Sequence, residues 1–183
     1  MKHLIKKLLR ESLLDEVSDE TLNIINTKYS NSPVFMMPGN KRGSQNQEQG
    51  INYKPISPNE QKINMKPKGL WYGIGNSWID WVRTEMPEWE TEQAYALSLN
   101  KSSMLTIRTY EELIEFDKQY SEGEYINWME VAKKYDGIEI APYISRARFE
   151  ILWYYGWDVA SGCIWGPNVI NDVYNITPTD KSL

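Results

Sequence analysis

The chain has 183 residues, 41% of them hydrophobic and 25% charged, which predicts one folded domain with a sizeable core and argues against global disorder. The net charge of −5 argues against broad binding to nucleic-acid phosphates, which requires a basic surface. One histidine, His3, and one cysteine, Cys163, exclude an internal disulfide and argue against a histidine-rich metal site or a Ser-His-Asp triad.

Residues 1–30 predict an N-terminal amphipathic helical arm. Within residues 2–16 the apolar side chains fall on one helical face, with lysines and an arginine opposite. We expect this helix to dock on the domain or on another subunit. Binding to a membrane surface is the weaker interpretation, because no aromatic side chain would anchor the interface, and no apolar run is long enough to span a bilayer. A second short helix is expected from Ser18 to Ile25, with Ser18 as its cap.

Two tripeptides of this arm, Leu9-Arg10-Glu11 and Leu14-Asp15-Glu16, resemble the Leu-x-Glu sites that prohead proteases of tailed phages cleave. The resemblance implies a phage protein that is cleaved after Glu11 or Glu16. It also implies contacts with other phage proteins through the N-terminal helix, and a location in the host cytoplasm or in the virion.

The single domain is predicted to occupy residues 31–183. Residues 33–37 predict its first core strand, which Pro38 and Gly39 end. The polar residues 39–65 have little apolar periodicity and predict a long loop, of a length that usually indicates a functional lid or a tether.

A Gly-Ile-Gly-Asn-Ser turn, residues 73–77, then connects a strand introduced by Pro67 and Gly69 to a helix that ends near Glu85, before Pro87. Ser77 is the expected cap of this helix. The favoured interpretation is a tight turn beside core aromatics. The alternative is a cradle for a ligand phosphate or amide, with the aromatics as a stacking platform. Its candidate cofactor-binding residues are Trp71, Tyr72, Gly73, Asn76 and Ser77.

The later segments mix strands and helices without a regular βαβ rhythm. Strands are expected at residues 94–99, 104–107, 138–141, 157–165 and 169–176, and helices at 109–120 and 127–134, capped by Thr109 and Asn127. Residues 144–154 leave helix and strand open. This order predicts an α+β fold with a mixed, mainly antiparallel split sheet and flanking helices.

Four short blocks, at residues 66–71, 128–132, 135–143 and 157–165, are similar to a set found in uncharacterised phage and bacterial proteins. The block order also resembles that of ADP-ribosyltransferase folds. In those folds a Gly-aromatic strand followed by a serine-led helix lines the nicotinamide pocket. Here residues 69–72 and Ser77 occupy that place, so the resemblance implies NAD as the cofactor.

Two positions depart from that resemblance. The first strand, residues 34–37, has no histidine or arginine, and the closing strand has Asp158 and Ser161 where a glutamate is usual. NAD cleavage needs a carboxylate to stabilise an oxocarbenium-like state, so Asp158 and Glu139 are the catalytic candidates. Strand alternation puts Glu139 opposite its isoleucine neighbours, either on a solvent face or facing a cleft. Asp158 either accepts backbone hydrogen bonds in a bend or lines the same cleft.

Two functions therefore stay open. One is an ADP-ribosyltransferase-like NAD-binding domain, with or without surviving catalysis. The other is a non-catalytic structural or virion-associated protein of a tailed phage. Convergence of Tyr72, Ser77, Glu139 and Asp158 on one cleft would favour the first.

Overall fold

The computed structural model describes residues 17–37, 51, 53–90 and 93–177. Its helices are α2 (Asp19–Lys28), α3 (Ser77–Glu85), α4 (Tyr110–Tyr120), α5 (Trp128–Ala132) and α6 (Leu152–Tyr155). Its strands are β1 (Pro33–Met37), β2 (Ile63–Asn64), β3 (Leu70–Ile74), β4 (Gln93–Leu99), β5 (Met104–Ile107), β6 (Ser121–Glu122), β7 (Tyr125–Asn127), β8 (Gly137–Ile140), β9 (Ser161–Ile164) and β10 (Ile170–Asn175). Short 3-10 turns are η1 (Pro58–Glu60), η2 (Pro87–Trp89), η3 (Lys101–Ser103) and η4 (Ala147–Phe149).

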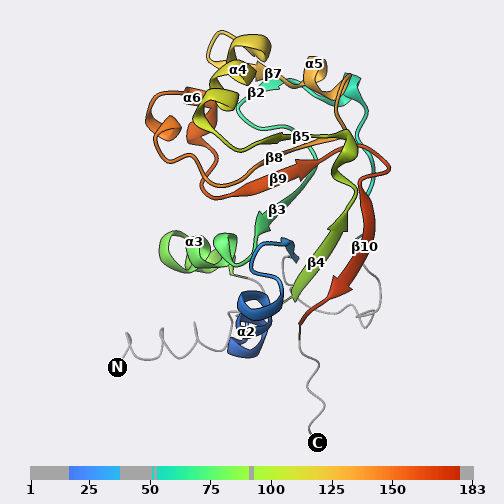
Figure 1. Cartoon of the computed structure of the whole chain (residues 1–183), viewed down its shortest axis with the longest axis vertical. Coiled ribbons are helices and arrows are strands. Elements are labelled where there is room, and N and C mark those ends of the chain that lie inside the picture. The colour runs from blue at the N-terminus through green and yellow to red at the C-terminus, as the bar shows by residue number, and fades with distance from the viewer. Residues whose placement is uncertain (1–16, 38–50, 52, 91–92, 178–183) are drawn as a thin grey trace, which may run out of the picture.

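Seven strands form one curled sheet in the order β10-β4-β1-β3-β9-β8-β5, and β2, β7 and β6 form a small second sheet. Every neighbouring pair is antiparallel except β5 and β8, which are parallel. Figure 1 shows α4, α5 and α6 gathered over β5, β8 and β9, while α2 and α3 lie at the other end of the molecule. The predicted α+β class with a mixed, mainly antiparallel sheet is confirmed.

The predicted helix caps are confirmed at three of four positions. The side chains of Ser18, Thr109 and Asn127 accept backbone N–H groups at the starts of α2, α4 and α5, and Thr109 forms a full capping box with Glu112. The prediction that Ser77 caps α3 is wrong. Asn76 is the N-cap residue, without a side-chain cap hydrogen bond, and α3 begins at Ser77 itself.

Two further segments differ from expectation. Residues 157–160 are not part of the closing strand, which spans only β9. The Ala160 carbonyl accepts hydrogen bonds from the Ile74 N–H and the Ser77 hydroxyl, so these contacts bend the chain before β9 begins. The undecided residues 144–154 form η4 and α6.

Some predictions fall outside the described residues. These are the helix at 2–16, both Leu-x-Glu tripeptides, and residues 39–50 and 52 of the predicted loop. Residues 53–65 of that loop contain η1 and β2, and β2 pairs with β7. Helix α2 belongs to the segment 1–30 that was predicted to be an arm. It packs on the domain, and its Ile25 is buried in one hydrophobic cluster with Val34 and Ile79.

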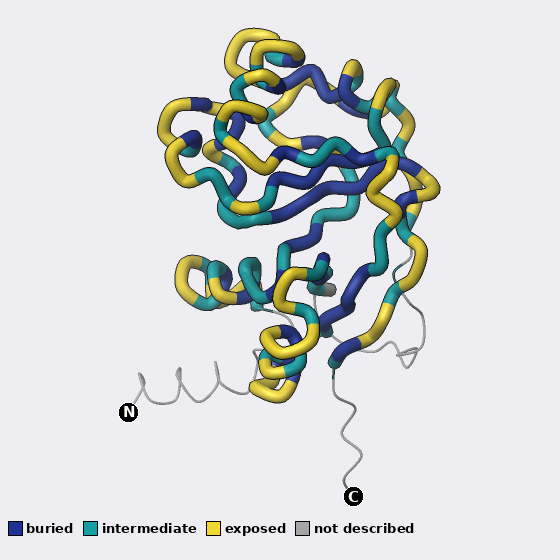
Figure 2. The backbone as a smooth tube through the Cα atoms, viewed as in Figure 1, coloured by how far each residue is buried: buried dark blue, intermediate teal, exposed yellow. Residues whose placement is uncertain are grey.

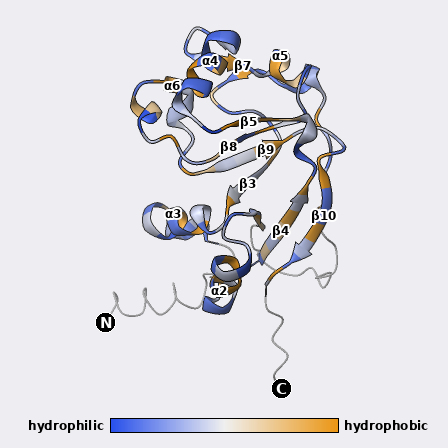
Figure 3. Cartoon of the chain, in the orientation of Figure 1, coloured by the Kyte–Doolittle hydropathy of each residue, from blue (hydrophilic) through white to orange (hydrophobic). Residues whose placement is uncertain are grey.

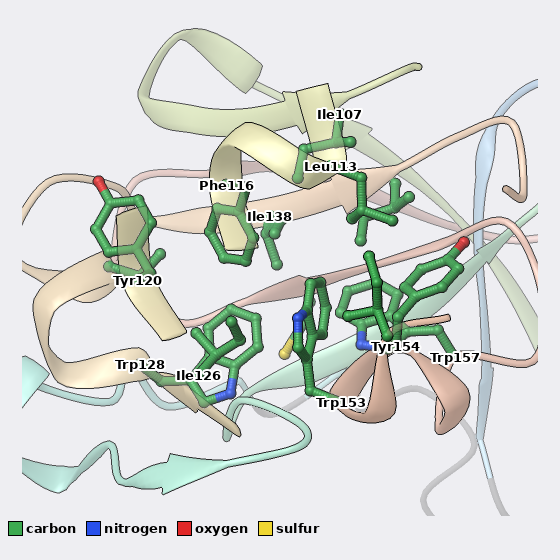
Figure 4. Packing of buried hydrophobic residues seen from close by; sticks show 14 of the residues in the cluster. Ile107, Leu113, Phe116, Tyr120, Ile126, Trp128, Ile138, Trp153, Tyr154 and Trp157 are labelled. Atoms are coloured by element: carbon green, nitrogen blue, oxygen red, sulfur yellow. The ribbon is translucent and has the colours of Figure 1, made fainter. Parts of the chain in front are cut away.

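The largest hydrophobic cluster lies between β5, β8 and β9 and the helices α4 to α6, and it contains four fully buried tryptophans. Figure 4 shows the rings of Phe116, Trp128 and Trp153 packed among aliphatic side chains from both layers. A second cluster on the opposite face of the sheet includes Tyr72 and Ile164.

Burial follows this layering. The central strands are dark in Figure 2 and the outer turns of the helices are exposed. Figure 3 shows both hydrophobic and hydrophilic residues along β4 and β10. Four consecutive residues of β4, Ala94 to Leu97, are buried, so both faces of that strand are covered, whereas Asn171, Asp172, Tyr174 and Asn175 of the edge strand β10 are exposed. Among the described residues, no helix combines the length and the hydropathy that crossing a bilayer requires.

Candidate functional site

The sheet splits between β1 and β3. These strands pair only at Pro33 with Ile74 and at Val34 with Gly73. Beyond that point β1 stays paired with β4, and β3 stays paired with β9. The sheet therefore consists of two halves, β10-β4-β1 and β3-β9-β8-β5, that share one short seam.

A cleft of about 460 Å³ opens at this split. That volume lies within the range of small-molecule sites. It is lined by Val34, Phe35, Met36, Lys66, Gly69, Leu70, Trp71, Tyr72, Gly73, Trp78, Trp157, Asp158, Val159 and Ser161. Five of these side chains are aromatic, so the walls favour a flat ring. Trp71 and Trp157 meet edge to face, with ring centroids 4.8 Å apart.

Main-chain groups of the two strand edges also face the cleft. The Gly75 N–H donates to the Ser32 carbonyl. Along an antiparallel strand every second residue directs its N–H and C=O to the same neighbouring strand. The odd-numbered residues of β3 and the even-numbered residues of β1 therefore direct their peptide groups across the split. Val34 and Gly73 use theirs in the seam. The next pair would be Met36 and Trp71, and no strand pairing joins them. Both line the cleft, which therefore offers peptide donors and acceptors without a strand partner among the described residues.

Two charged side chains line the cleft. Lys66 lies at the rim, with its ammonium 5.3 Å from the Trp71 ring centroid. Desolvation by the surrounding walls lowers the pKa of Lys66, and the nearby Asp158 carboxylate opposes that shift. Asp158 contacts Arg148 Nη2 at 3.4 Å through its Oδ1. At this length the ion pair is weak, so Asp158 retains capacity to accept a ligand hydrogen bond.

Glu139 lies behind the cleft wall. The ring of Tyr72 lies across Gly162, where an added Cβ would come within 2.3 Å of the phenol. The Tyr72 hydroxyl donates to Glu139 Oε2 at 2.8 Å, and Lys101 Nζ donates to Oε1 at 2.8 Å. Burial, followed by the charge and hydrogen bond of Glu139, raises the pKa of Tyr72 well above its usual value. Glu139 is only 5% exposed, so the interpretation that it lies on a solvent face is wrong.

The predicted site residues thus divide into three groups. Trp71, Tyr72, Gly73 and Asp158 line the cleft, and Glu139 reaches it only through the Tyr72 hydroxyl. Asn76 and Ser77 lie outside the lining. The amide of Asn76 donates to Asp80, and the Ser77 hydroxyl donates to Ala160 and accepts from the Ile74 N–H.

Sequence reasoning missed several lining residues. Trp157 was expected only as part of a buried strand, whereas Trp78 was expected as a core residue or, in the alternative interpretation, as part of a stacking platform. Lys66 was expected only as part of a Pro/Gly-rich lead-in to a strand. The distances in sequence between Lys66, Trp71 and Trp157 do not predict that these residues lie together. They are brought together by the pairing of strands across the sheet.

No protein-family model, curated protein or solved structure matches this chain. Within the described residues, no group of three His, Cys, Asp or Glu side chains is placed to hold a metal ion. Among the described residues, the groups that line the cleft are aromatic side chains, peptide donors and acceptors without a strand partner, one carboxylate and one ammonium. This combination suits a heteroaromatic ring that has a polar substituent and is attached to a hydroxylated, anionic group.

Proposed function

We propose that this protein is a NAD-binding domain of the ADP-ribosyltransferase-like kind, and that the cleft between β1 and β3 takes the nicotinamide end of the dinucleotide. The observation that supports this most is the split itself. It leaves an aromatic-lined cleft whose β1 and β3 edges have no strand partner beyond the seam among the described residues, and Trp71 and Tyr72, which the resemblance assigns to a nicotinamide pocket, line it.

The carboxamide of nicotinamide has one acceptor oxygen and a donor NH₂ group. The peptide groups of Met36 and Trp71 offer the complementary N–H and C=O across the split. The ring itself would lie against the indoles of Trp71 or Trp78, because Trp157 is only 1% exposed. Hydrogen bonds to a buried polar substituent orient a ligand that ring stacking alone would leave free to rotate.

Asp158 is the lining carboxylate, and in this proposal it accepts hydrogen bonds from the ribose hydroxyls. Of the two catalytic candidates, Asp158 is the one that lines the cleft and could contact a ligand there. The Glu139 carboxylate is instead bonded to Tyr72 and Lys101, behind the cleft wall. Any cleavage of the nicotinamide bond would therefore rely on Asp158 for electrostatic stabilisation of the ribosyl cation.

The test is isothermal titration calorimetry of the purified protein with NAD and with nicotinamide mononucleotide, paired with an assay for nicotinamide release. We expect both nucleotides to bind. Asp158→Asn should weaken both by roughly tenfold, the value of about one charge-assisted hydrogen bond, and should abolish any nicotinamide release. Asp172→Asn, an exposed carboxylate on β10, is the matched control and should bind like the parent protein. Absence of binding heat at millimolar concentrations of both nucleotides would overturn the proposal.

The alternative function is a non-catalytic structural or virion-associated phage protein. It rests on residues 1–16, which lie outside the described residues, on the long polar segment 39–65 and on the missing first-strand histidine. Of the four residues whose convergence on one cleft would favour the NAD-binding domain, Ser77 and Glu139 do not line the cleft, and this observation favours the alternative.

A further inference from the structure

Three tryptophans form a row that starts at the cleft. Trp78 and Trp81 are three residues apart on α3 and therefore share a helix face. Their rings are stacked, with centroids 5.1 Å apart and an interplanar angle of 20°. Trp89, in η2, lies next to Trp81 with centroids 6.3 Å apart at 51°. Trp78 also lines the cleft, so the row continues the aromatic wall outward along α3.

The inner side of this row rests on the core. Trp78 and Trp89 border one small cavity of about 10 Å³ together with Ile79 and Val82, which are the two buried residues of α3. A cavity this small shows that Trp78 and Trp89 pack closely above these aliphatic side chains. The row is therefore held in place from below and does not depend on a ligand for its position.

The outer side of the row is open to solvent. Trp89 is 52% exposed, and Trp78 and Trp81 are half-buried. Trp89 therefore presents about half of its surface to water, next to two tryptophans that are only partly covered. Indole faces accept nucleobases of any sequence by stacking. The row is thus suited to a second flat ring joined to the ring that occupies the cleft.

We propose that the row of Trp78, Trp81 and Trp89 is a second ring-binding subsite, which stacks the adenine of NAD while the cleft holds the nicotinamide, with Trp89 as its principal adenine contact. This inference rests on the proposed function and extends it from one half of the ligand to both. It also states the ligand class: a dinucleotide with two heteroaromatic rings is preferred over a mononucleotide with one.

The experiment compares NAD, nicotinamide mononucleotide and AMP by calorimetry on the full chain and on Trp89→Ala. In the parent protein NAD should bind at least fivefold more tightly than nicotinamide mononucleotide. Trp89→Ala should weaken NAD and AMP by roughly fivefold or more, the lower end of the effect of losing one base-stacking aromatic. Its affinity for nicotinamide mononucleotide should stay within about twofold of the parent value, because that ligand lacks adenine.

Phe149→Ala is the matched control, since Phe149 is an 83% exposed aromatic in η4 that does not line the cleft. It should leave the affinities for all three ligands unchanged. Trp89→Phe and Trp89→Leu separate stacking from packing. Trp89→Phe should retain part of the preference for NAD over nicotinamide mononucleotide. Trp89→Leu should lose that preference while its Tm equals that of Trp89→Phe.

An unchanged preference for NAD over nicotinamide mononucleotide in Trp89→Ala or Trp89→Leu would overturn the subsite and leave the cleft proposal standing. Failure of both nucleotides to bind the parent protein would instead overturn the proposed function, and the subsite with it. The two failures are therefore distinguishable in one set of titrations.

Discussion

At the scale of single residues, Tyr72 has two roles. It lines the cleft, and its hydroxyl satisfies a buried carboxylate that a single partly exposed lysine also contacts. An unpaired buried carboxylate would be costly, so the Tyr72 and Lys101 contacts allow Glu139 to stay inside the curled sheet. A displacement of the Tyr72 ring would therefore change the cleft wall and would also remove a hydrogen bond from the buried Glu139 carboxylate.

The raised pKa of Tyr72 predicts alkaline sensitivity. Below pH about 10 both folded and unfolded Tyr72 are protonated, so its contribution is constant. As pH rises further, the unfolded tyrosine ionises while the folded one keeps its proton, and the free energy of unfolding falls. Urea denaturation at pH about 9 and about 11 should show this loss. Tyr72→Phe should be less stable at pH about 8, by roughly 1–3 kcal/mol, because Glu139 loses a donor.

That variant should also lose less stability than the parent protein between the two alkaline pH values. Burial also raises the pKa values of Tyr53, Tyr154, Tyr143 and the Cys163 thiol, and these groups contribute to the slope that remains. An identical slope in parent and variant would contradict the assignment to Tyr72.

At the scale of elements, the register of three strands creates this arrangement. Glu139 of β8 is paired with Gly162 of β9, which is paired with Tyr72 of β3. All three residues point to the same face, and the central one is a glycine. The absent side chain leaves the space through which the Tyr72 ring reaches across β9 to Glu139.

Gly162→Ala tests this reading of the register. The new methyl group would come within 2.3 Å of the Tyr72 phenol, so the ring must leave its place. We expect a loss of roughly 1–3 kcal/mol in the free energy of unfolding, the usual cost of overpacking. Gly156→Ala is the control, because its Cβ would come closest to the flexible end of Lys66, at 3.2 Å, with Met65 Cε and the Trp153 carbonyl at ordinary contact distances of 3.6 and 3.9 Å. Equal stability of both variants in urea denaturation would contradict the packing of Tyr72 over Gly162.

At the scale of the whole molecule, the two half-sheets pair at only two residue pairs, and one hydrophobic cluster that includes Tyr72, Leu97 and Ile164 bridges them. The half with β8 and β9 is covered by α4 to α6, whereas β1 and β4 pack against α2 and α3 through Ile25 and Ile79. Sheet pairing would normally close the edges of β1 and β3 against each other. Their separation is what leaves room for a ligand.

A ligand held between the half-sheets requires the native arrangement of both, so it should stabilise the whole fold. By mass action, nicotinamide mononucleotide at about 100 times its dissociation constant should add about 2.7 kcal/mol to the free energy of unfolding. Thermal denaturation followed by tryptophan fluorescence measures the accompanying rise in Tm. Asp158→Asn should show a smaller rise at the same ligand concentration. An unchanged Tm in the parent protein at millimolar ligand would contradict binding at the split.

The sequence alone determined the features that depend on neighbours along the chain. The capping boxes and caps at Ser18, Thr109 and Asn127 follow from spacing of three residues, and strands such as β1 and β5 follow from short apolar runs bounded by turn residues. The α+β class followed from the irregular order of these elements. Ser77 was misassigned because it is the first residue of α3, and its hydroxyl accepts the Ile74 N–H and donates to the Ala160 carbonyl, which lies far along the chain.

Only the tertiary structure decided which faces of the strands are inside. Alternation showed that Glu139 points away from Ile138 and Ile140, but whether that side meets water depends on the curl of the sheet and on the reach of Tyr72 and Lys101. The cleft likewise arises where β1 and β3 stop pairing, and residues as distant as Lys66 and Trp157 line it. Strand order and register are long-range properties, and local periodicity contains no information about them.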